Sequence, residues 1–328
     1  MPATFAHCLI ARKAIERASK VKHAHKYCGL LSIHNNFVTM GATGPDYPYL
    51  TDIITYGALK FGHNWANRMH YENVSVFVKL GLSKLSEMDK TGDEFSIFLA
   101  WLCGYVSHII ADSFVHPVVN CTVGGPYMFT CSEHGECELI QDIYIFNEET
   151  GTDIVTANPH DRGTFGYLDI LDDCSDPNDT NRIHPTIRTN WSEILQKAHP
   201  GARKFFKDID PDTWHRNYKD RVDFSTNPGA IFRHIFGMIG IPAYKKASEI
   251  LIDEKKKYID GVLLPNGAKA GYGDVFNRTV EKVVSIWKML FQIVENSTPD
   301  SMGSVKNWNL DTGVDESRID LWIRGAMK

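Results

Sequence analysis

The segment from Asp93 to His116 is the most apolar in the chain, and it restricts the possible folds more than any other segment. A helix of this length could span a bilayer, and Asp93 and Pro117 are typical of a helix start and a helix end. However, Ser107, His108 and Asp112 interrupt the run, and an acidic residue inside a spanning helix costs roughly 2.5 to 3.5 kcal/mol. We therefore predict a central helix in a soluble domain, buried on nearly all sides and ending at Pro117.

Apolar residues elsewhere recur mainly at helical spacing, and strand signals are few. Helices are predicted at residues 3–20, 73–89, 188–208, 229–258 and 274–296. These elements predict an all-α fold.

The other segments contain fewer regular patterns. Residues 29–50 hold several Gly and Pro residues and are predicted to be mostly loop. Residues 118–182 are predicted to be irregular, apart from a short helix from Glu133 to Phe146. We expect one helical domain over residues 1–297 and a polar tail over residues 298–328, where a last short helix could cover residues 316–326.

Charge and cysteine content exclude several kinds of site. The 328-residue chain has a net charge of −5 and a pI near 6.3, whereas a duplex nucleic acid partner calls for clustered Lys and Arg. Seven cysteines without a CxxC pair argue against a cysteine-based zinc site and against a full disulfide framework. The N-terminal stretch lacks the apolar region of a secretory signal. We expect a cytoplasmic setting, or export by a route that the sequence does not reveal.

The segment SHIIADSFVHP carries the strongest chemical signal, because His108, Asp112 and His116 are spaced four residues apart. Each helical residue advances by about 100°, so all three side chains point to nearly the same side of the predicted helix. Imidazole and carboxylate groups are good zinc ligands. A polar stripe satisfied by hydrogen bonds is the alternative, but buried charged groups need partners. The pattern favours a metal site.

Four other segments carry residues of the same types. His134 and Glu138 form another pair at a spacing of four, His70 lies in MHYENV, Asp46 lies in GATGPDYPYL, and His7 lies in the first predicted helix. Each segment alone is a weak signal, because such residues occur by chance on many helices. Their order along the chain is more specific.

In this order, the segments resemble the motifs of the zinc-dependent phospholipase C family, which shares its fold with the fungal single-strand-specific nucleases. The family carries an N-terminal metal-binding group, a helical His, a loop Asp and a further His. A His-x3-Asp helix, another His and a final His-x3-Glu or His-x3-Asp follow. The matching residues are His7, Asp46, His70, His108, Asp112, His116, His134 and Glu138. The match covers roughly residues 2–140 and implies a multi-helix domain with long loops.

The resemblance also implies three zinc ions and assigns ligands to each. One ion would be held by Asp46, His70, His108 and Asp112, with Asp112 bridging to another. A second would be held by His116, His134 and Glu138. The third would use His7, Asp112 and the amine and carbonyl of the chain's first residue.

Three features leave this ligand set open. Secreted members begin with Trp after their signal is removed, whereas Pro2 follows Met1 here. Removal of Met1 would place the Pro2 amine within reach of His7, whereas retention of Met1 leaves the third ion open. The alternative is a site with two ions, in which His7 only packs against or caps the first helix. His63 could replace His70, although HYEN resembles the family motif better. The spacing from Asp112 to His116 is also shorter than in the secreted enzymes.

The expected activity is hydrolysis of a phosphodiester by water. Zinc ions polarise phosphoryl oxygens and lower the pKa of water to around 7, and Asp46 is the expected base as well as a ligand. By resemblance, the expected substrate is a phospholipid, with peripheral contact to a membrane and no transmembrane segment. A single-strand nuclease and a non-catalytic, metal-stabilised interaction protein remain alternatives.

Overall fold

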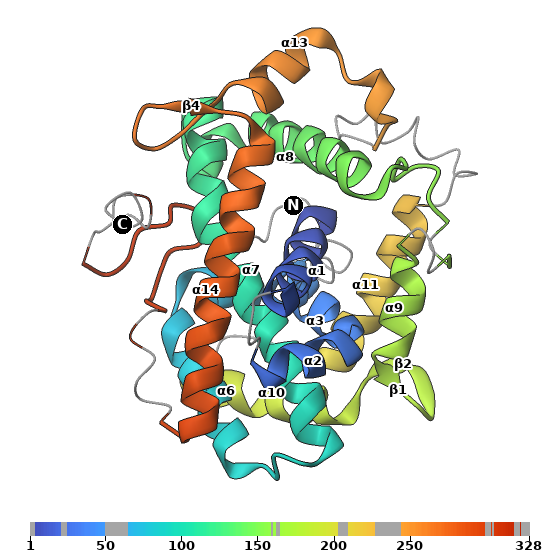
Figure 1. Ribbon diagram of the computed structural model, residues 1–328, viewed down its shortest axis with the longest axis vertical. Helices are drawn as coiled ribbons and strands as arrows, with labels where there is room; N and C mark the ends of the chain where they lie inside the picture. Colours follow the sequence, from blue (N-terminus) through green and yellow to red (C-terminus); the bar gives the residue numbers. More distant parts are fainter. Residues whose placement is uncertain are drawn as a thin grey trace.

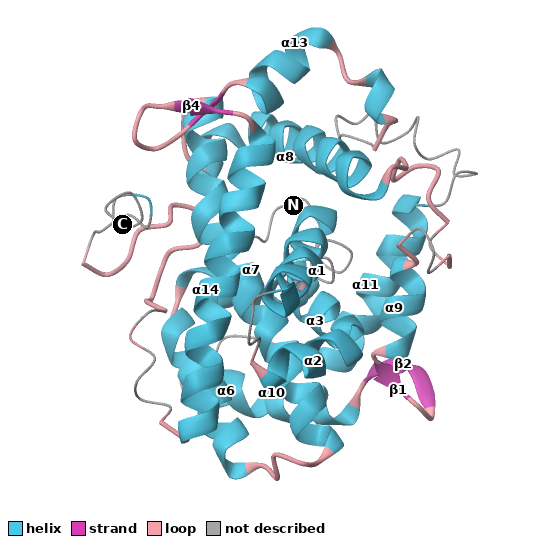
Figure 2. Cartoon of the chain, in the orientation of Figure 1, coloured by secondary structure: helices cyan, strands magenta, loops and turns pink. Residues whose placement is uncertain are grey.

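The described part of the chain is built almost entirely from helices (Figure 2). The computed structural model describes residues 4–20, 25–49, 65–158, 160–161, 165–202, 209–226, 244–298, 303, 305–317 and 322. Within these ranges, the strands form only two small antiparallel hairpins. The prediction of an all-α fold is confirmed.

The elements follow one another as labelled in Figure 1. The longer helices are α1 (Thr4–Lys20), α6 (Val74–Glu87), α7 (Asp93–Val123), α8 (Tyr127–Thr150), α10 (Pro185–Ala198), α11 (Pro211–Thr226) and α14 (Tyr272–Asn296). The shorter ones are α2 (Lys26–Ile33), α3 (Asn35–Gly41), η1 (Gly44–Asp46), α5 (Trp65–Tyr71), α9 (Tyr167–Asp173), η4 (Ala247–Glu249), α13 (Ile252–Lys255) and η5 (Lys256–Asp260). The strands are β1 (Ser175–Asp176), β2 (Asp179–Ile183), β3 (Val262–Leu263) and β4 (Lys269–Ala270).

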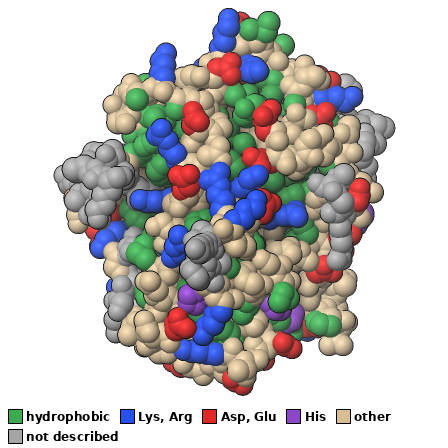
Figure 3. All heavy atoms as spheres, in the orientation of Figure 1, with side chains coloured by type: hydrophobic (Ala, Val, Ile, Leu, Met, Phe, Trp, Pro, Cys, Tyr) green, Lys and Arg blue, Asp and Glu red, His purple; other side chains and the backbone are tan. Residues whose placement is uncertain are grey.

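Helix α7 forms the centre of the fold, and α1, α3, α6, α8, α10 and α14 pack around it. It is the one described helix long and apolar enough to cross a membrane, but 89% of its most apolar window is buried inside the protein. The indole of Trp287 in α14 donates a 2.9 Å hydrogen bond to the Cys103 carbonyl of α7. Burial of this kind matches the predicted central helix. On the face of the molecule drawn in Figure 3, acidic and basic side chains lie among apolar ones.

The prediction that this helix ends at Pro117 is wrong, because α7 continues to Val123 and stops at Gly124, whose φ is +92°. Proline removes one N–H and therefore one hydrogen bond to the carbonyl four residues earlier, that of Ser113. The residues after Pro117 still gain burial, since Val118 and Val119 are almost inaccessible to solvent. Burial of these side chains offsets the lost bond, so the helix is not broken.

The prediction of loop over residues 29–50 is also wrong, because α2, α3 and η1 cover most of this segment. Gly41 is not a turn residue but a packing residue. A β-carbon there would collide with the Trp101 carbonyl of α7, and one at Gly104 would collide with the Val38 carbonyl of α3. The two glycines let the helix backbones touch, and no local pattern in the sequence reveals that contact.

Of the other predicted helices, some lie where they were expected, one is longer and others are shorter than predicted. Helices α1, α6 and α14 lie where helices were predicted. Helix α8 is longer than the predicted short helix, with a kink at Thr130, and residues 118–123 belong to α7. Residues 229–243 and most of 316–326 lie outside the described residues, whereas 247–260 hold only short helical segments.

Candidate metal centre

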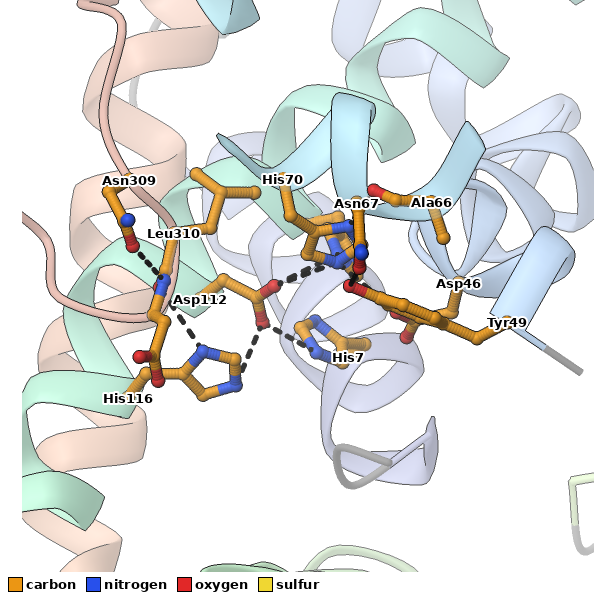
Figure 4. Close-up of polar contacts among 12 residues, drawn as sticks. His7, Asp46, Tyr49, Ala66, Asn67, His70, Asp112, His116, Asn309 and Leu310 are labelled. Carbon is orange, nitrogen blue, oxygen red and sulfur yellow. Dashed lines mark hydrogen bonds and ion pairs between the residues drawn. The ribbon is translucent and has the colours of Figure 1, made fainter. Parts of the chain in front are cut away.

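Helix α7 presents His108, Asp112 and His116 to a common site, as their spacing predicts. Figure 4 shows Asp112 and His116 of this series. Asp112 lies between the two histidines: its Oδ2 is 3.1 Å from His108 Nε2, and its Oδ1 is 3.5 Å from His116 Nε2. All three side chains are buried, and Asp112 is 1% exposed. A buried carboxylate between two imidazoles is the arrangement that a bridging metal ligand requires.

Two residues from outside α7 complete what we call the deep group, which consists of Asp46, His70, His108 and Asp112. His70 Nε2 lies 3.3 Å from Asp46 Oδ1, 3.4 Å from Asp112 Oδ2 and 3.2 Å from His108 Nε2. Asp46 ends η1, and His70 lies on α5. His63 lies outside the described residues, so the structure places His70 in the cluster without testing His63.

A second cluster, the outer group, consists of His116, His134 and Glu138. Glu138 Oε1 lies 3.1 Å from His116 Nε2 and 3.1 Å from His134 Nε2. His134 and Glu138 lie one turn apart on α8, which contacts α7. The ring of the partly exposed Tyr127 packs edge-on against His134 at 5.1 Å, so this group is closer to solvent than the deep group.

His7 approaches the deep group from helix α1. Its Nε2 is 3.0 Å from Asp112 Oδ1, and its ring stacks on His108 with centroids 4.3 Å apart. The start of α1 is fixed by Asp142, which accepts hydrogen bonds from the backbone N–H groups of Phe5 (3.3 Å) and Ala6 (2.6 Å). Residues 1–3 lie outside the described residues, so a role for the first amine stays a proposal.

The hydrogen bonds of the deep histidines fit a metal ion. His108 Nδ1 lies 2.9 Å from the Ala42 carbonyl, and His70 Nδ1 lies 2.7 Å from the Ala66 carbonyl. A carbonyl only accepts, so each Nδ1 carries the proton, and in a neutral ring Nε2 then offers a lone pair. These lone pairs face Asp46 Oδ1 and Asp112 Oδ2, buried oxygens without a hydrogen-bond partner among the described residues. Such converging acceptors need positive charge between them, supplied either by a metal ion or by protons on the Nε2 atoms.

The whole cluster divides into three sets of atoms close enough to share an ion. Asp46, His70 and His108 form one set, His7, His108 and Asp112 another, and His116, His134 and Glu138 a third, with ligand atoms within 4.8 Å of one another in each.

A model of the zinc-dependent phospholipase C family matches residues 6–201, more than half of the chain. The chain belongs to this zinc-dependent family. No curated protein and no solved structure matches the chain in the same comparisons. The matched range contains every residue of the deep and outer groups, and these groups could hold the metal ions on which the family depends.

Electrostatics within the cluster favour protons on two of the nitrogens that would bind a metal ion. Burial lowers the pKa of His70 and of His116, but neighbouring carboxylates outweigh it and raise these values to about 9 and about 10. Burial raises the pKa of Asp112, yet His108, His116 and His7 hold it well below its ordinary range. His108 responds mainly to burial, which lowers its pKa. Without metal, protons on His70 and His116 therefore balance the buried carboxylates.

The sequence analysis missed two groups that support the residues of this centre. Asp142 lies four residues after Glu138, so the spacing that singled out His134 and Glu138 continues to it and could have identified it. Leu310 contributes its backbone carbonyl, which lies 3.1 Å from His116 Nδ1, and no side-chain pattern reveals such a contact. Another buried histidine, His215, pairs instead with Ser175 at 3.0 Å.

Proposed function

We propose that this protein hydrolyses a phospholipid at its phosphodiester, as a zinc-dependent phospholipase C holding two or three zinc ions in the deep and outer groups. One observation carries the proposal: imidazole nitrogens and carboxylate oxygens of three buried sets converge to within 4.8 Å of one another, close enough in each set to share an ion. Bound zinc would polarise a phosphoryl oxygen and lower the pKa of water to around 7.

Asp46 is the proposed base. Burial raises the pKa of Asp46, but His108 and His70 lower it below its ordinary value, so the carboxylate is ionised at neutral pH. It can take a proton as water attacks phosphorus and the bond from phosphorus to the glycerol oxygen breaks. The leaving oxygen gains a proton, and the products are a diacylglycerol and a phosphorylated head group.

Substrate and base can be tested together. Purified protein supplied with zinc should release a phosphorylated head group from short-chain phosphatidylcholine, and chelation should abolish the release.

Asp46→Asn should reduce the rate by roughly 100- to 10,000-fold, the range for loss of a general base, while keeping most of its zinc. Cleavage of single-stranded DNA but not lipid would indicate the nuclease alternative. Zinc binding without hydrolysis of either would indicate a metal-stabilised interaction protein.

Contact with the lipid surface is proposed at the start of α8. Met128 and Phe129 are 82% and 80% exposed, and they directly follow Tyr127, whose ring contacts His134. Large apolar side chains beside the outer group could enter a membrane and bring lipid to the site. Transfer of such a side chain from water is worth about 1.5 to 3 kcal/mol.

The contact predicts a difference between vesicles and dissolved substrate. Phe129→Ser should lower hydrolysis of phosphatidylcholine vesicles by about tenfold or more, with little change for short-chain monomers. Ile33→Ser is a matched control, because Ile33 is 79% exposed on α2, and it should change neither rate. Equal vesicle rates for wild type and Phe129→Ser would refute the contact.

A further inference from the structure

Leu310 lies between the deep and outer groups although it is 194 residues from His116 in the sequence. Its carbonyl accepts a 3.1 Å hydrogen bond from His116 Nδ1, and its own N–H donates a 3.0 Å bond to the His70 carbonyl. Figure 4 shows Leu310 and Asn309 beside His116 and His70. One backbone unit near the C-terminus therefore contacts a histidine of each group.

A tight turn holds this backbone unit in place. Within residues 307–314, which we call the C-terminal strap, Asn309 N–H donates to the Val314 carbonyl at 3.0 Å, and Gly313 N–H donates to the Asn309 carbonyl at 2.8 Å. Asn120 of α7 donates from Nδ2 to the Asp311 carbonyl at 2.7 Å. The strap is thus tied to α7 next to the residue that contacts His116.

The strap docks where α7 has lost a hydrogen bond. Pro117 has no N–H for the Ser113 carbonyl, and Gly313 packs directly on that carbonyl and on the proline ring. A β-carbon at Gly313 would collide with the Ser113 oxygen and lie 2.8 Å from Pro117 Cγ, and the Gly313 φ of +65° disfavours other residues as well. Only glycine allows the strap to approach α7 this closely.

We propose that the C-terminal strap is a positioning element of the metal centre. The Leu310 carbonyl keeps the proton of neutral His116 on Nδ1, so that the lone pair on Nε2 faces Glu138 and Asp112. Partners that orient a ligand in this way are typically worth 10- to 100-fold in metal affinity. The strap lies outside residues 6–201 that the family model matches, so the family motif alone is an incomplete outer group. The inference rests on the zinc site of the proposed function, but not on its substrate.

Gly313→Ala is the primary test, because the added methyl group must push the strap off α7. Zinc titration of metal-free protein should show one site weakened by about 10- to 100-fold, with the deep-group affinity retained. In the zinc-loaded protein, the His116 Nδ1–H proton should be slowly exchanging by NMR, and it should exchange faster in the variant. Asn120→Ala should act in the same direction with a smaller effect, and it decides the matter if Gly313→Ala does not fold.

Two glycine variants separate positioning from general destabilisation. Gly267 has a φ of +83° with nothing within 4 Å of an added β-carbon, and Gly303 is exposed with equally open surroundings. Gly267→Ala should lower thermal stability through backbone strain without changing zinc affinity, and Gly303→Ala should change neither. Wild-type zinc affinity in both Gly313→Ala and Asn120→Ala, or an equal loss at every site, would overturn the proposal. Zinc-binding wild-type protein that hydrolyses no phosphodiester would overturn only the proposed function.

Discussion

The deep and outer groups use the same kinds of ligand but are supported differently. In the deep group, His70 and His108 are oriented by carbonyls of α5 and of the α3 terminus, and His108 is fully buried. In the outer group, His116 depends on Leu310, and His134 Nδ1 has no hydrogen-bond partner among the described residues. The comparison teaches that the deep histidines are oriented from within the first half of the chain, whereas the outer group also contacts the C-terminal strap.

Asp112→Asn should have the largest effect, because this carboxylate faces both groups. Its Oδ1 lies near His7 and His116, and its Oδ2 near His70 and His108. We expect zinc content to fall at both ends and hydrolysis to drop by more than about 100-fold, beyond the usual cost of an outer partner. Metal analysis and a lipid assay measure this, with the exposed Asp253→Asn as the control. Wild-type hydrolysis in Asp112→Asn would rule out a bridging role.

Glu138→Gln should separate the two ends. Glu138 contacts His116 and His134 but no residue of the deep group, so the variant should lose about one zinc per chain and keep the metal of the deep group. The loss of activity should be smaller than in Asp112→Asn. Zinc stoichiometry by mass spectrometry under native conditions checks this; simultaneous loss of all zinc would mean that the two groups are one cooperative site.

The pH dependence of stability should have opposite signs with and without metal. The raised pKa values of His70 and His116 stabilise the metal-free fold below about 6.5, the ordinary histidine value, and this contribution is lost as pH rises through about 9 and about 10. Zinc needs unprotonated rings, so its affinity grows over the same range. Thermal unfolding should therefore show the metal-free midpoint falling from pH 6.5 to 9.5 while the zinc-dependent increment grows. Parallel curves would contradict the competition between protons and metal.

An N-terminal extension should have the smallest effect. Asp142 fixes Phe5 and Ala6, and His7 lies beside Asp112, so the start of α1 is held close to the centre. If the α-amine of Pro2 completes a third zinc site, residues added before it should remove about one zinc and weaken hydrolysis, because an internal amide cannot serve as that ligand. Equal zinc content in extended and native chains would limit the centre to two ions.

Local patterns in the sequence predicted the features that depend on local spacing. The i, i+4, i+8 series placed His108, Asp112 and His116 together, and apolar periodicity located α1, α6 and α14. The ligand roles and the boundary at residue 297 remain predictions, although the C-terminal strap contacts the centre from beyond that boundary.

What could not be predicted depends on contacts between distant segments. Gly41 lies in a segment rich in Gly and Pro, which is typical of a loop. Only the structure shows that this glycine lies in a helix, where it makes room for the backbone of α7. Pro117 is tolerated because burial of the following turn compensates for one lost bond. The carbonyl of Leu310 acts through a backbone group that every residue shares, so its sequence carries no trace of the role.

The contact between Gly41 and Gly104 also determines how related sequences can diverge. A methyl group at either position would separate α3 from α7, moving the Ala42 carbonyl away from His108 and carrying Asp46 with it. A substitution that touches no candidate ligand would then disturb the deep group. We therefore expect a related sequence that keeps all eight histidines and carboxylates, but has lost either glycine, to bind metal weakly at the deep group and to have little activity.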